Sequence, residues 1–435
     1  EEAFWKVNPE LFSNLKIRAS YGSLGNGNVS PYSFLELLSI STSGRVLNGL
    51  KNKYTSAPAV MPDGLTWETA TTTDVGLDFG MLNNRLQFNG DYYIRKTTDM
   101  YTVGKTLPDV FGASSPKGNY ADMTTKGWEI TLTWRDQFTL AEKPFNYEIR
   151  GTLSDYISTI DRYNNQTGNL DDYYAGKRVG EIWGYVTEGL FKDQADIDSH
   201  ADQTLIQSSS KRITYPGDVK IKDLNGDHVI DYGNNTVDDH GDKTVIGNAL
   251  PRYAYSINLS GDWNNFFLSA FFQGVGKQDW YPSSECIFWG QYNRPYNNMP
   301  TWHQGNYWTE DNTDAYLPRY AGYNASLKST PQTRYLQNVA YIRLKNLQFG
   351  YTLPQPIVSK AKLQNVRVYI SAENLWCWSP LYKHTRDLDV TNIYGSDPDL
   401  TDADMSSGLN GNRGSGDGNS YPQMKSVSLG LSVTF

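Results

Sequence analysis

The chain has 435 residues, of which 39 are Lys or Arg and 47 are Asp or Glu, so its formal net charge is −8. This acidic balance argues against a nucleic-acid partner. No stretch approaches the roughly 18 consecutive apolar residues of a membrane-spanning helix. Length alone suits two or three soluble domains. However, a polar average is also compatible with a membrane β-barrel, whose lumen-facing residues and long loops dilute the apolar signal.

The cysteine content and the first residues narrow the class further. Cys286 and Cys377 are far apart, which excludes a disulfide-dense scaffold or a Cys-rich zinc module but leaves one disulfide open. The chain begins Glu1-Glu2-Ala3, with neither an initiator Met nor the basic and apolar segments of a signal peptide. We therefore expect a mature product or a fragment.

Strict alternation of apolar and polar residues, the period of a strand with two different faces, dominates the chain. In the last run, Val427, Leu429, Leu431 and Val433 alternate with small or polar residues. A slip of phase near Asn346 predicts a β-bulge. We count about ten runs, each near the length that a tilted strand needs to cross a bilayer. In chain order, they centre on 17–21, 75–79, 86–94, 128–134, 145–153, 253–259, 266–272, 342–351, 366–372 and 427–435.

The connections between these runs alternate in length, as do the short periplasmic turns and long outer loops of bacterial outer-membrane barrels. Long structureless loops are rare in compact soluble domains. Short connections are expected at 80–84, 139–143, 262–265 and 354–362, and long ones at about 23–65, 102–123, 159–251, 279–337 and 377–421.

The two faces of the expected strands differ in chemistry. One face carries charged residues such as Arg18, Asp91 and Glu148, too many for a protein core. The other is apolar and ends in aromatic residues such as Trp134 and Trp263, which is typical of a lipid-facing surface with aromatic girdles. A soluble antiparallel sheet with one solvated face gives the same alternation. The sorting of loops by length favours the membrane barrel.

Several segments carry a family resemblance. They are 15–26 (LKIRASYGSLGN), 30–32 (SPY), 65–68 (LTWE), 74–79 (DVGLDF), 91–100 (DYYIRKTTDM), 126–129 (KGWE), 217–231, 246–251 (IGNALP), 271–274 (FFQG), 341–346 (YIRLKN), 372–375 (AENL) and the terminal Phe435. With these segments in this order over nearly its whole length, the chain resembles the SusC/RagA family of TonB-dependent outer-membrane transporters of Bacteroidetes.

The resemblance implies an all-β fold, a transmembrane antiparallel β-barrel with long extracellular loops. Residues 1–435 would be the C-terminal portion, about the last ten of roughly 22 strands. The plug domain and the TonB box are expected to be absent from this chain. Half a barrel leaves two unpaired edges, near Ile17 and Val433, which cannot lie in lipid. Another polypeptide or fragment would then supply the remainder. The competing interpretation is a complete ten-stranded barrel.

The resemblance also implies a function in the outer membrane of a Gram-negative, Bacteroidetes-like bacterium. It implies active import of large nutrients, with oligosaccharides as the expected cargo and oligopeptides as the alternative, driven by the TonB complex through the missing N-terminal part. A SusD-like surface lipoprotein would cover the outer loops.

A calcium-like motif lies in the longest loop, 159–251. Asp223, Asn225 and Asp227 offer side-chain oxygens, Val229 a backbone carbonyl and Asp231 a further carboxylate, at positions 1, 3, 5, 7 and 9 of an EF-hand-type loop. We expect a Ca²⁺ ion to stiffen this loop, and no organic cofactor. An Asx-rich turn without metal is the alternative.

Two positions depart from the EF-hand pattern. His228 occupies position 6, where Gly is usual, and Asn234 occupies position 12 in place of a bidentate acid. Asp238, Asp239 or Asp242 could supply the missing ligand, and Asp238 is included in the expected metal set.

Aromatic residues are frequent in the loops 159–251 and 279–337. Flat rings stack on sugar faces, and neighbouring amides and guanidinium groups bind hydroxyls. Alternatively, the rings pack the loops together or contact a partner, since interfaces are rich in Trp, Tyr and Arg. The candidate substrate-binding residues are Trp289, Tyr292, Asn293, Arg294, Trp302 and Trp308.

The sequence offers no catalytic constellation. It contains no HExxH, GxSxG, Walker A or Rossmann motif, so we expect that the chain is not an enzyme. Two other classes stay open. A soluble or surface glycan-binding β-sheet protein would bury its apolar strand face under a second sheet. A carbohydrate-active enzyme would need a matched carboxylate pair in a cleft.

Overall fold

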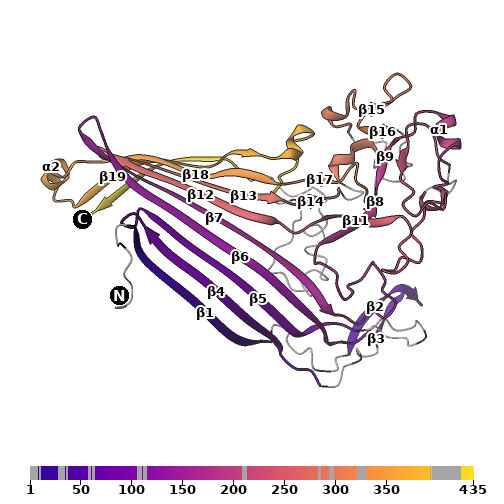
Figure 1. Cartoon of the computed structure of the whole chain (residues 1–435). Helices are drawn as coiled ribbons and strands as arrows, with labels where there is room; N and C mark the ends of the chain where they lie inside the picture. Colours follow the sequence, from indigo (N-terminus) through magenta and orange to yellow (C-terminus); the bar gives the residue numbers. More distant parts are fainter. Residues whose placement is uncertain are drawn as a thin grey trace.

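A ten-stranded antiparallel sheet forms most of the protein. The computed structural model describes residues 8, 11–27, 35, 38–56, 60, 64–104, 110, 115–207, 213–282, 286–292, 298–320, 330–391, 393 and 423–435. Strands of the main sheet lie side by side in chain order (Figure 1). They are β1 (Phe12–Asn26), β4 (Glu68–Met81), β5 (Leu86–Val103), β6 (Lys117–Leu140), β7 (Lys143–Arg162), β12 (Arg252–Trp263), β13 (Phe266–Lys277), β18 (Tyr341–Thr352), β19 (Asn365–Trp378) and β20 (Ser426–Thr434).

These ten strands coincide with the ten runs of alternating residues, so the expected all-β fold is confirmed. β6 has 24 residues and β7 has 20. Because a tilted strand crosses a bilayer with about 9–11 residues, roughly half of each of these strands extends beyond the membrane. Among the described residues, no helix is long and apolar enough to cross a membrane.

Tight turns join the strands at one end of the sheet, as the sequence predicts. Ala141 and Glu142 have φ values of +47° and +62°, and Asn264 and Asn265 have +45° and +70°. Positive φ at both central residues is the signature of the type I′ hairpin turn, whose twist matches that of the flanking strands. The longer connection after β18 contains the short helix α2 (Gln355–Val358) and the 3₁₀ turn η6 (Ser359–Ala361).

The expected bulge near Asn346 is confirmed. Phe271 and Phe272 on β13 pair with Asn346 and Leu344 on β18, so Lys345 is skipped. The pairing of β18 with β19 shifts at the same place. The extra residue keeps Leu344 and Leu347 on one face although they are three positions apart.

The apolar face of the sheet is uncovered. Leu132, Ile149, Leu268 and Ile370, on four different strands, are 46–51% exposed. No second sheet covers this face within the described residues, since the other sheets have two strands each. On the opposite face, Arg18 pairs with Asp78 and Asp91. The sheet thus has one apolar face and one charged face, as the wall of a membrane barrel does. The expectation of two or three soluble domains from length alone is wrong.

The sheet is open at both ends. β1 pairs only with β4 and β20 only with β19 among the described strands. The edges are strongly exposed: Ile17 on β1 is 74% exposed and Leu429 on β20 is 78% exposed. The alternative of a complete ten-stranded barrel is therefore not observed.

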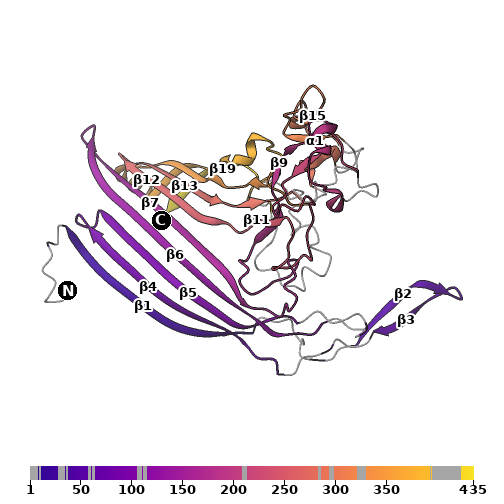
Figure 2. The same ribbon diagram turned by 45° about the vertical axis from the view of Figure 1, so that its right-hand side comes forward.

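The described parts of the connections after β7, β13 and β19 gather beyond the end of the sheet opposite the tight turns, whereas the hairpin of residues 39–56 lies apart from them (Figures 1 and 2). A buried aromatic and aliphatic cluster joins residues from 185–230, 280–339 and 381–393, and we call this region the loop body. The smaller elements of the long connections are β2 (Ser39–Leu47), β3 (Leu50–Ser56), β8 (Glu181–Tyr185), β9 (Thr187–Leu190), α1 (Gln194–Asp198), η2 (Thr204–Ile206), β10 (Val219–Ile221), β11 (Lys243–Asn248), β14 (Asp279–Trp280), η3 (Ile287–Tyr292), η4 (Thr301–His303), β15 (Tyr307–Trp308), β16 (Leu317–Arg319), β17 (Gln337–Asn338) and η7 (Pro380–Lys383).

Candidate functional site

The loop body is held together by contacts between distant segments. The Thr187 hydroxyl donates to Gln332 Oε1 at 2.8 Å, and the Tyr185 backbone amide donates to the Pro331 carbonyl at 3.0 Å. β14 pairs with β17 across more than fifty residues of chain. These bonds make one compact unit from the segments 159–251 and 279–337.

Candidate aromatic residues occupy two different environments in this unit. Trp289 and Tyr292 have no exposed surface, and the Tyr292 hydroxyl donates to the Pro318 carbonyl at 2.6 Å. Trp302 and Trp308 are half-buried. Asn293 and Arg294 lie outside the described residues. Trp289 and Tyr292 therefore pack inside the loop body and offer no surface to a ligand. Trp302 and Trp308 keep exposed area that a ligand could contact.

His303 lies at the centre of the aromatic cluster and is fully buried. Its Nε2 lies 2.9 Å from the Phe288 carbonyl, and its Nδ1 lies 2.7 Å from the Tyr320 hydroxyl. The carbonyl can only accept, so Nε2 carries the proton and the Tyr320 hydroxyl donates to Nδ1. Burial lowers the pKa of His303 to about 4. The imidazole is therefore neutral and connects η4 to η3 and to the segment after β16.

The calcium-like segment folds into a tight loop closed by its own side chains. Asp223 accepts from the Gly226 and His228 amides at 2.6 and 2.9 Å, and these bonds hold the pKa of Asp223 low against partial desolvation. His228 has a φ of +65°, so it adopts the left-handed conformation usual for Gly at position 6. Asn225 and Asp227 accept in turn from the Asp227 and Val229 amides.

Asp242 closes this loop. Its carboxylate accepts from the Leu224 and Asp231 amides at 2.7 and 3.0 Å, which joins the beginning of the segment to its end. Asp238 is exposed. Within the described residues, no three His, Cys, Asp or Glu side chains converge on one metal position. Calcium binding by this segment stays a prediction.

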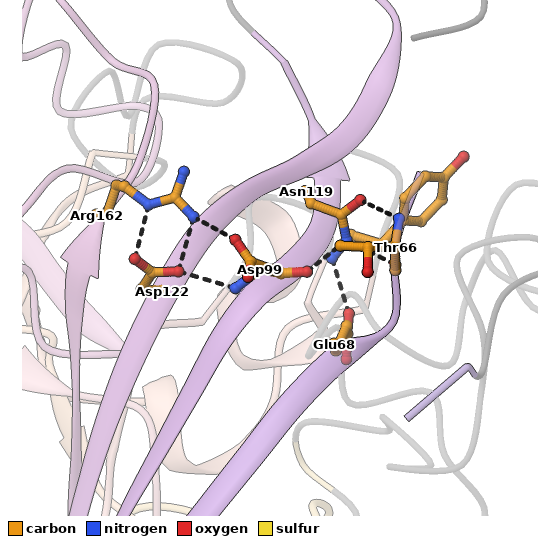
Figure 3. A network of polar contacts seen from close by, with 7 residues as sticks. Thr66, Glu68, Asp99, Asn119, Asp122 and Arg162 are labelled. Carbon is orange, nitrogen blue, oxygen red and sulfur yellow. Dashed lines mark hydrogen bonds and ion pairs between the residues drawn. The ribbon is translucent and has the colours of Figure 1, made fainter. Parts of the chain in front are cut away.

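A polar network fastens the outer ends of β4 to β7 (Figure 3). Asp99 has a φ of +56° at a register shift between β5 and β6, and its amide donates to Asp122 at 2.9 Å. Arg162 binds both oxygens of Asp122 and lies 3.1 Å from Asp99. The Asn119 side-chain amide donates to the backbone carbonyls of Thr66 and Asp99. The strands are thus fixed where they emerge toward the loops.

A buried ion pair, which sequence reasoning missed, ties the last loop to the barrel wall. Arg343 on β18 lies 2.6 Å from Asp389, and the two side chains are 4% and 6% exposed. Arg343 also donates to Gln423, and Asp389 accepts from the Gln423 and Thr391 amides. The single signal in the sequence was one Arg among alternating residues, which gives no partner.

Two of the cavities formed by the described residues lie along the sheet. One, of about 680 Å³, is near the tight turns and is lined by charged residues that include Arg85, Arg135 and Glu148. The other, of about 490 Å³, lies between β7, β8, β11 and the outer ends of β12 and β13. We call the second one the outer-end cavity. Its charged lining residues are Arg178, Glu181, Arg252, Lys277 and Asp279.

Cys286 is buried and Cys377 is partly exposed, and the two do not form a disulfide with each other. The disulfide that the sequence left open is therefore not formed.

Comparisons with known proteins agree with this architecture. No family model matches the chain. TonB-dependent receptor P3 of Formosa agariphila is 29% identical over 97% of this chain and 39% of its own length. TonB-dependent receptor P26 of the same organism is 27% identical over 100% of this chain and 41% of its own length. TonB-dependent receptor SusC of Bacteroides thetaiotaomicron is 22% identical over 99% and 39%.

Solved structures show the same fold. A structure of the RagAB peptide importer in the open-open state has a TM-score of 0.68 and 19% identity, covering all of this chain and 41% of that one. A structure of the RagAB peptide transporter has a TM-score of 0.65 and 20% identity, covering 87% and 38%.

The chain spans about two fifths of the length of the curated relatives that it matches. These relatives are named as receptors, in agreement with the expectation that this chain is not an enzyme. The expected outer-membrane location is likewise confirmed by the relationship to SusC and RagA. On sequence and fold together, the chain is a relative of the TonB-dependent receptors of the SusC/RagA family.

Proposed function

We propose that the chain forms part of the wall and the outer loops of a transporter that imports large nutrients across the outer membrane with energy from TonB. The observation that carries the proposal is the open ten-stranded sheet. One face is apolar and exposed, and the other carries ion pairs such as Arg18–Asp78. Such a sheet suits a bilayer on one side and water on the other.

The open edges need further strands. Unpaired backbone groups at β1 and β20 are costly in lipid because no water is present to bind them. We propose that the remaining wall, a plug and the segment that contacts TonB belong to another part of the same protein or to a separate fragment.

A surface lipoprotein partner is part of this proposal, and the hairpin β2–β3 supports it. The hairpin extends away from the sheet (Figure 2), and Ile40, Val46, Leu47 and Leu50 are 57–71% exposed. An isolated two-stranded hairpin is marginally stable in water. Residues 38–56 contain three cations and no acid. These features suit contact with an acidic partner surface, and we propose that a SusD-like lipoprotein supplies it.

Oligosaccharides are the proposed cargo, because Trp302 and Trp308 are only half-buried and aromatic rings with exposed area can stack on sugar faces. Oligopeptides are the second candidate, because the RagAB structures are described as those of a peptide importer.

The test is uptake by a strain that lacks the receptor gene and is complemented with the full-length gene. We expect labelled oligosaccharides to enter the complemented strain and to be excluded when TonB is deleted. Uptake of oligopeptides alone would select the second candidate. Uptake of neither, with the receptor correctly inserted, would contradict the proposal.

The partner is tested separately by replacing residues 38–56 with a Gly/Ser linker and purifying the receptor in detergent. We expect the surface lipoprotein to co-purify with the unaltered receptor and to be lost from the variant. Equal recovery from both would remove the hairpin from the interface.

A further inference from the structure

Acidic and basic side chains both line the outer-end cavity. The acidic side chains already accept hydrogen bonds from the protein, whereas the basic ones keep N–H groups that a ligand could use. Glu181 accepts from the Arg178 backbone amide at 3.0 Å and from the Tyr174 hydroxyl at 2.9 Å. Asp279 accepts from the Asn248 amide at 3.0 Å. Both carboxylates therefore serve to fix the loops around the cavity.

The cations differ from the acids in this respect. Arg252 binds Asp155 through Nε and one terminal nitrogen. A guanidinium has five N–H groups, so the others remain available to a ligand. Lys277 is 60% exposed and forms a long ion pair with Asp279 at 3.8 Å, beyond hydrogen-bond distance, so its ammonium N–H groups remain available to a ligand. The Arg178 guanidinium is exposed and pairs with no acid within the described part of the chain.

We propose that the outer-end cavity binds a carboxylate of an imported ligand, held by Arg178, Lys277 and the remaining N–H groups of Arg252. This inference rests on the proposed function and adds a substrate class to it, ligands that carry a carboxylate. A volume of about 490 Å³ is within the range of small-ligand sites and accommodates one sugar ring or one terminal amino acid.

Carboxylate recognition follows from the geometry of the donors. Guanidinium groups match a carboxylate with two parallel N–H bonds, and charge-assisted bonds are about twice as strong as neutral ones. Tyr156, Val245 and Leu250 supply apolar lining against which a ring or side chain can pack. A uronic-acid residue and a peptide C-terminus present the same group, so the probes must distinguish these two sources.

The experiment measures dissociation constants by calorimetry on the full-length receptor in detergent. The probes are tetragalacturonate, maltotetraose, tetra-alanine and tetra-alanine amide. The variant is Arg178→Gln/Lys277→Gln. The control is Lys192→Gln/Lys222→Gln, which removes the same charge from exposed positions that do not line the cavity.

We expect a carboxylate probe to bind about tenfold more weakly to the cavity variant and unchanged to the control. Binding of tetragalacturonate identifies a glycan source, and preference for tetra-alanine over its amide identifies a peptide source. Equal binding of a carboxylate probe to the cavity variant and the unaltered receptor, or no binding of either carboxylate probe, would overturn the inference. Uptake of neutral oligosaccharides by the variant would still support the proposed function.

Discussion

His303 shows how a single buried residue makes the loop body sensitive to pH. The imidazole donates to the Phe288 carbonyl and accepts from the Tyr320 hydroxyl, and burial lowers its pKa to about 4. In an unfolded chain, His titrates near 6.5. Between these values the unfolded state binds more protons, so the free energy of unfolding falls as pH decreases.

We expect the loop body to lose up to roughly 3 kcal/mol of stability between pH 6.5 and 4 through this residue. Chemical denaturation of the purified receptor, followed by Trp fluorescence at several pH values, measures the loss. His303→Gln keeps one donor and one acceptor but does not titrate, so its pH dependence should be smaller. The control is His228→Asn, at an exposed position whose φ of +65° Asn tolerates. Identical pH profiles for His303→Gln and the unaltered protein would contradict this account.

At the scale of a strand, glycines on the charged face make room for aromatic rings. A Cβ atom at Gly350 on β18 would lie 2.5 Å from the Phe267 ring and 2.7 Å from the Tyr369 Cβ. A Cβ atom at Gly151, which follows Ile149 by two residues on the apolar face of β7, would meet nothing within 4 Å. Phe267 also carries the Arg367 guanidinium 4.4 Å above its ring. Gly350 therefore leaves the space that the Phe267 ring of the Arg367–Phe267 stack occupies, whereas no ring packs against Gly151.

We expect Gly350→Ala to destabilise the barrel by about 1–3 kcal/mol, because overpacking shifts side chains and backbone. Gly151→Ala is the matched control and should assemble normally. Heat-dependent mobility of the outer-membrane receptor on SDS gels reports the folded fraction. Equal folded fractions for the two variants would show that the rings move aside without cost.

The calcium-like loop gives an element-scale test that does not depend on transport. Each Asp carboxylate in it can accept a backbone amide and still offer lone pairs to a cation. We expect Ca²⁺ to raise the melting temperature of the receptor by a few degrees and Asp227→Ala to abolish the rise. Comparing Asp242→Ala with Asp238→Ala then shows whether the rise depends on Asp242, which closes the loop, or on the exposed Asp238. No calcium effect on the unaltered receptor would leave an Asx turn without metal.

The sequence predicts the strands well because each strand is decided by neighbours two residues apart. The run from Val427 to Val433 alternates whatever else the chain does. The burial of Trp289 depends on segments more than forty residues away, such as the one that contains Tyr335, whose ring centroid lies 5.3 Å from that of Trp289. Composition marks such a ring as functional or structural without deciding which. The Arg343–Asp389 pair was missed for the same reason.

For the whole molecule, the open sheet implies a complement. The β1 and β20 edges expose a row of unpaired N–H and C=O groups, which invites further pairing and cannot face lipid. In the assembled receptor, both edges should therefore be hydrogen-bonded to strands outside the described sheet. The hairpin β2–β3 should instead remain open to solvent unless a partner covers it.

Amide hydrogen exchange of the full-length receptor in detergent tests this arrangement. We expect peptides from β1 and β20 to exchange as slowly as those from the central strand β6, because a ladder bond protects each amide. Residues 38–56 should exchange rapidly in the receptor alone and slow down when the surface lipoprotein is added. Rapid exchange along β1 in the assembled receptor would mean that this edge is a true rim of the protein. The barrel would then have to close in a way that leaves β1 unpaired.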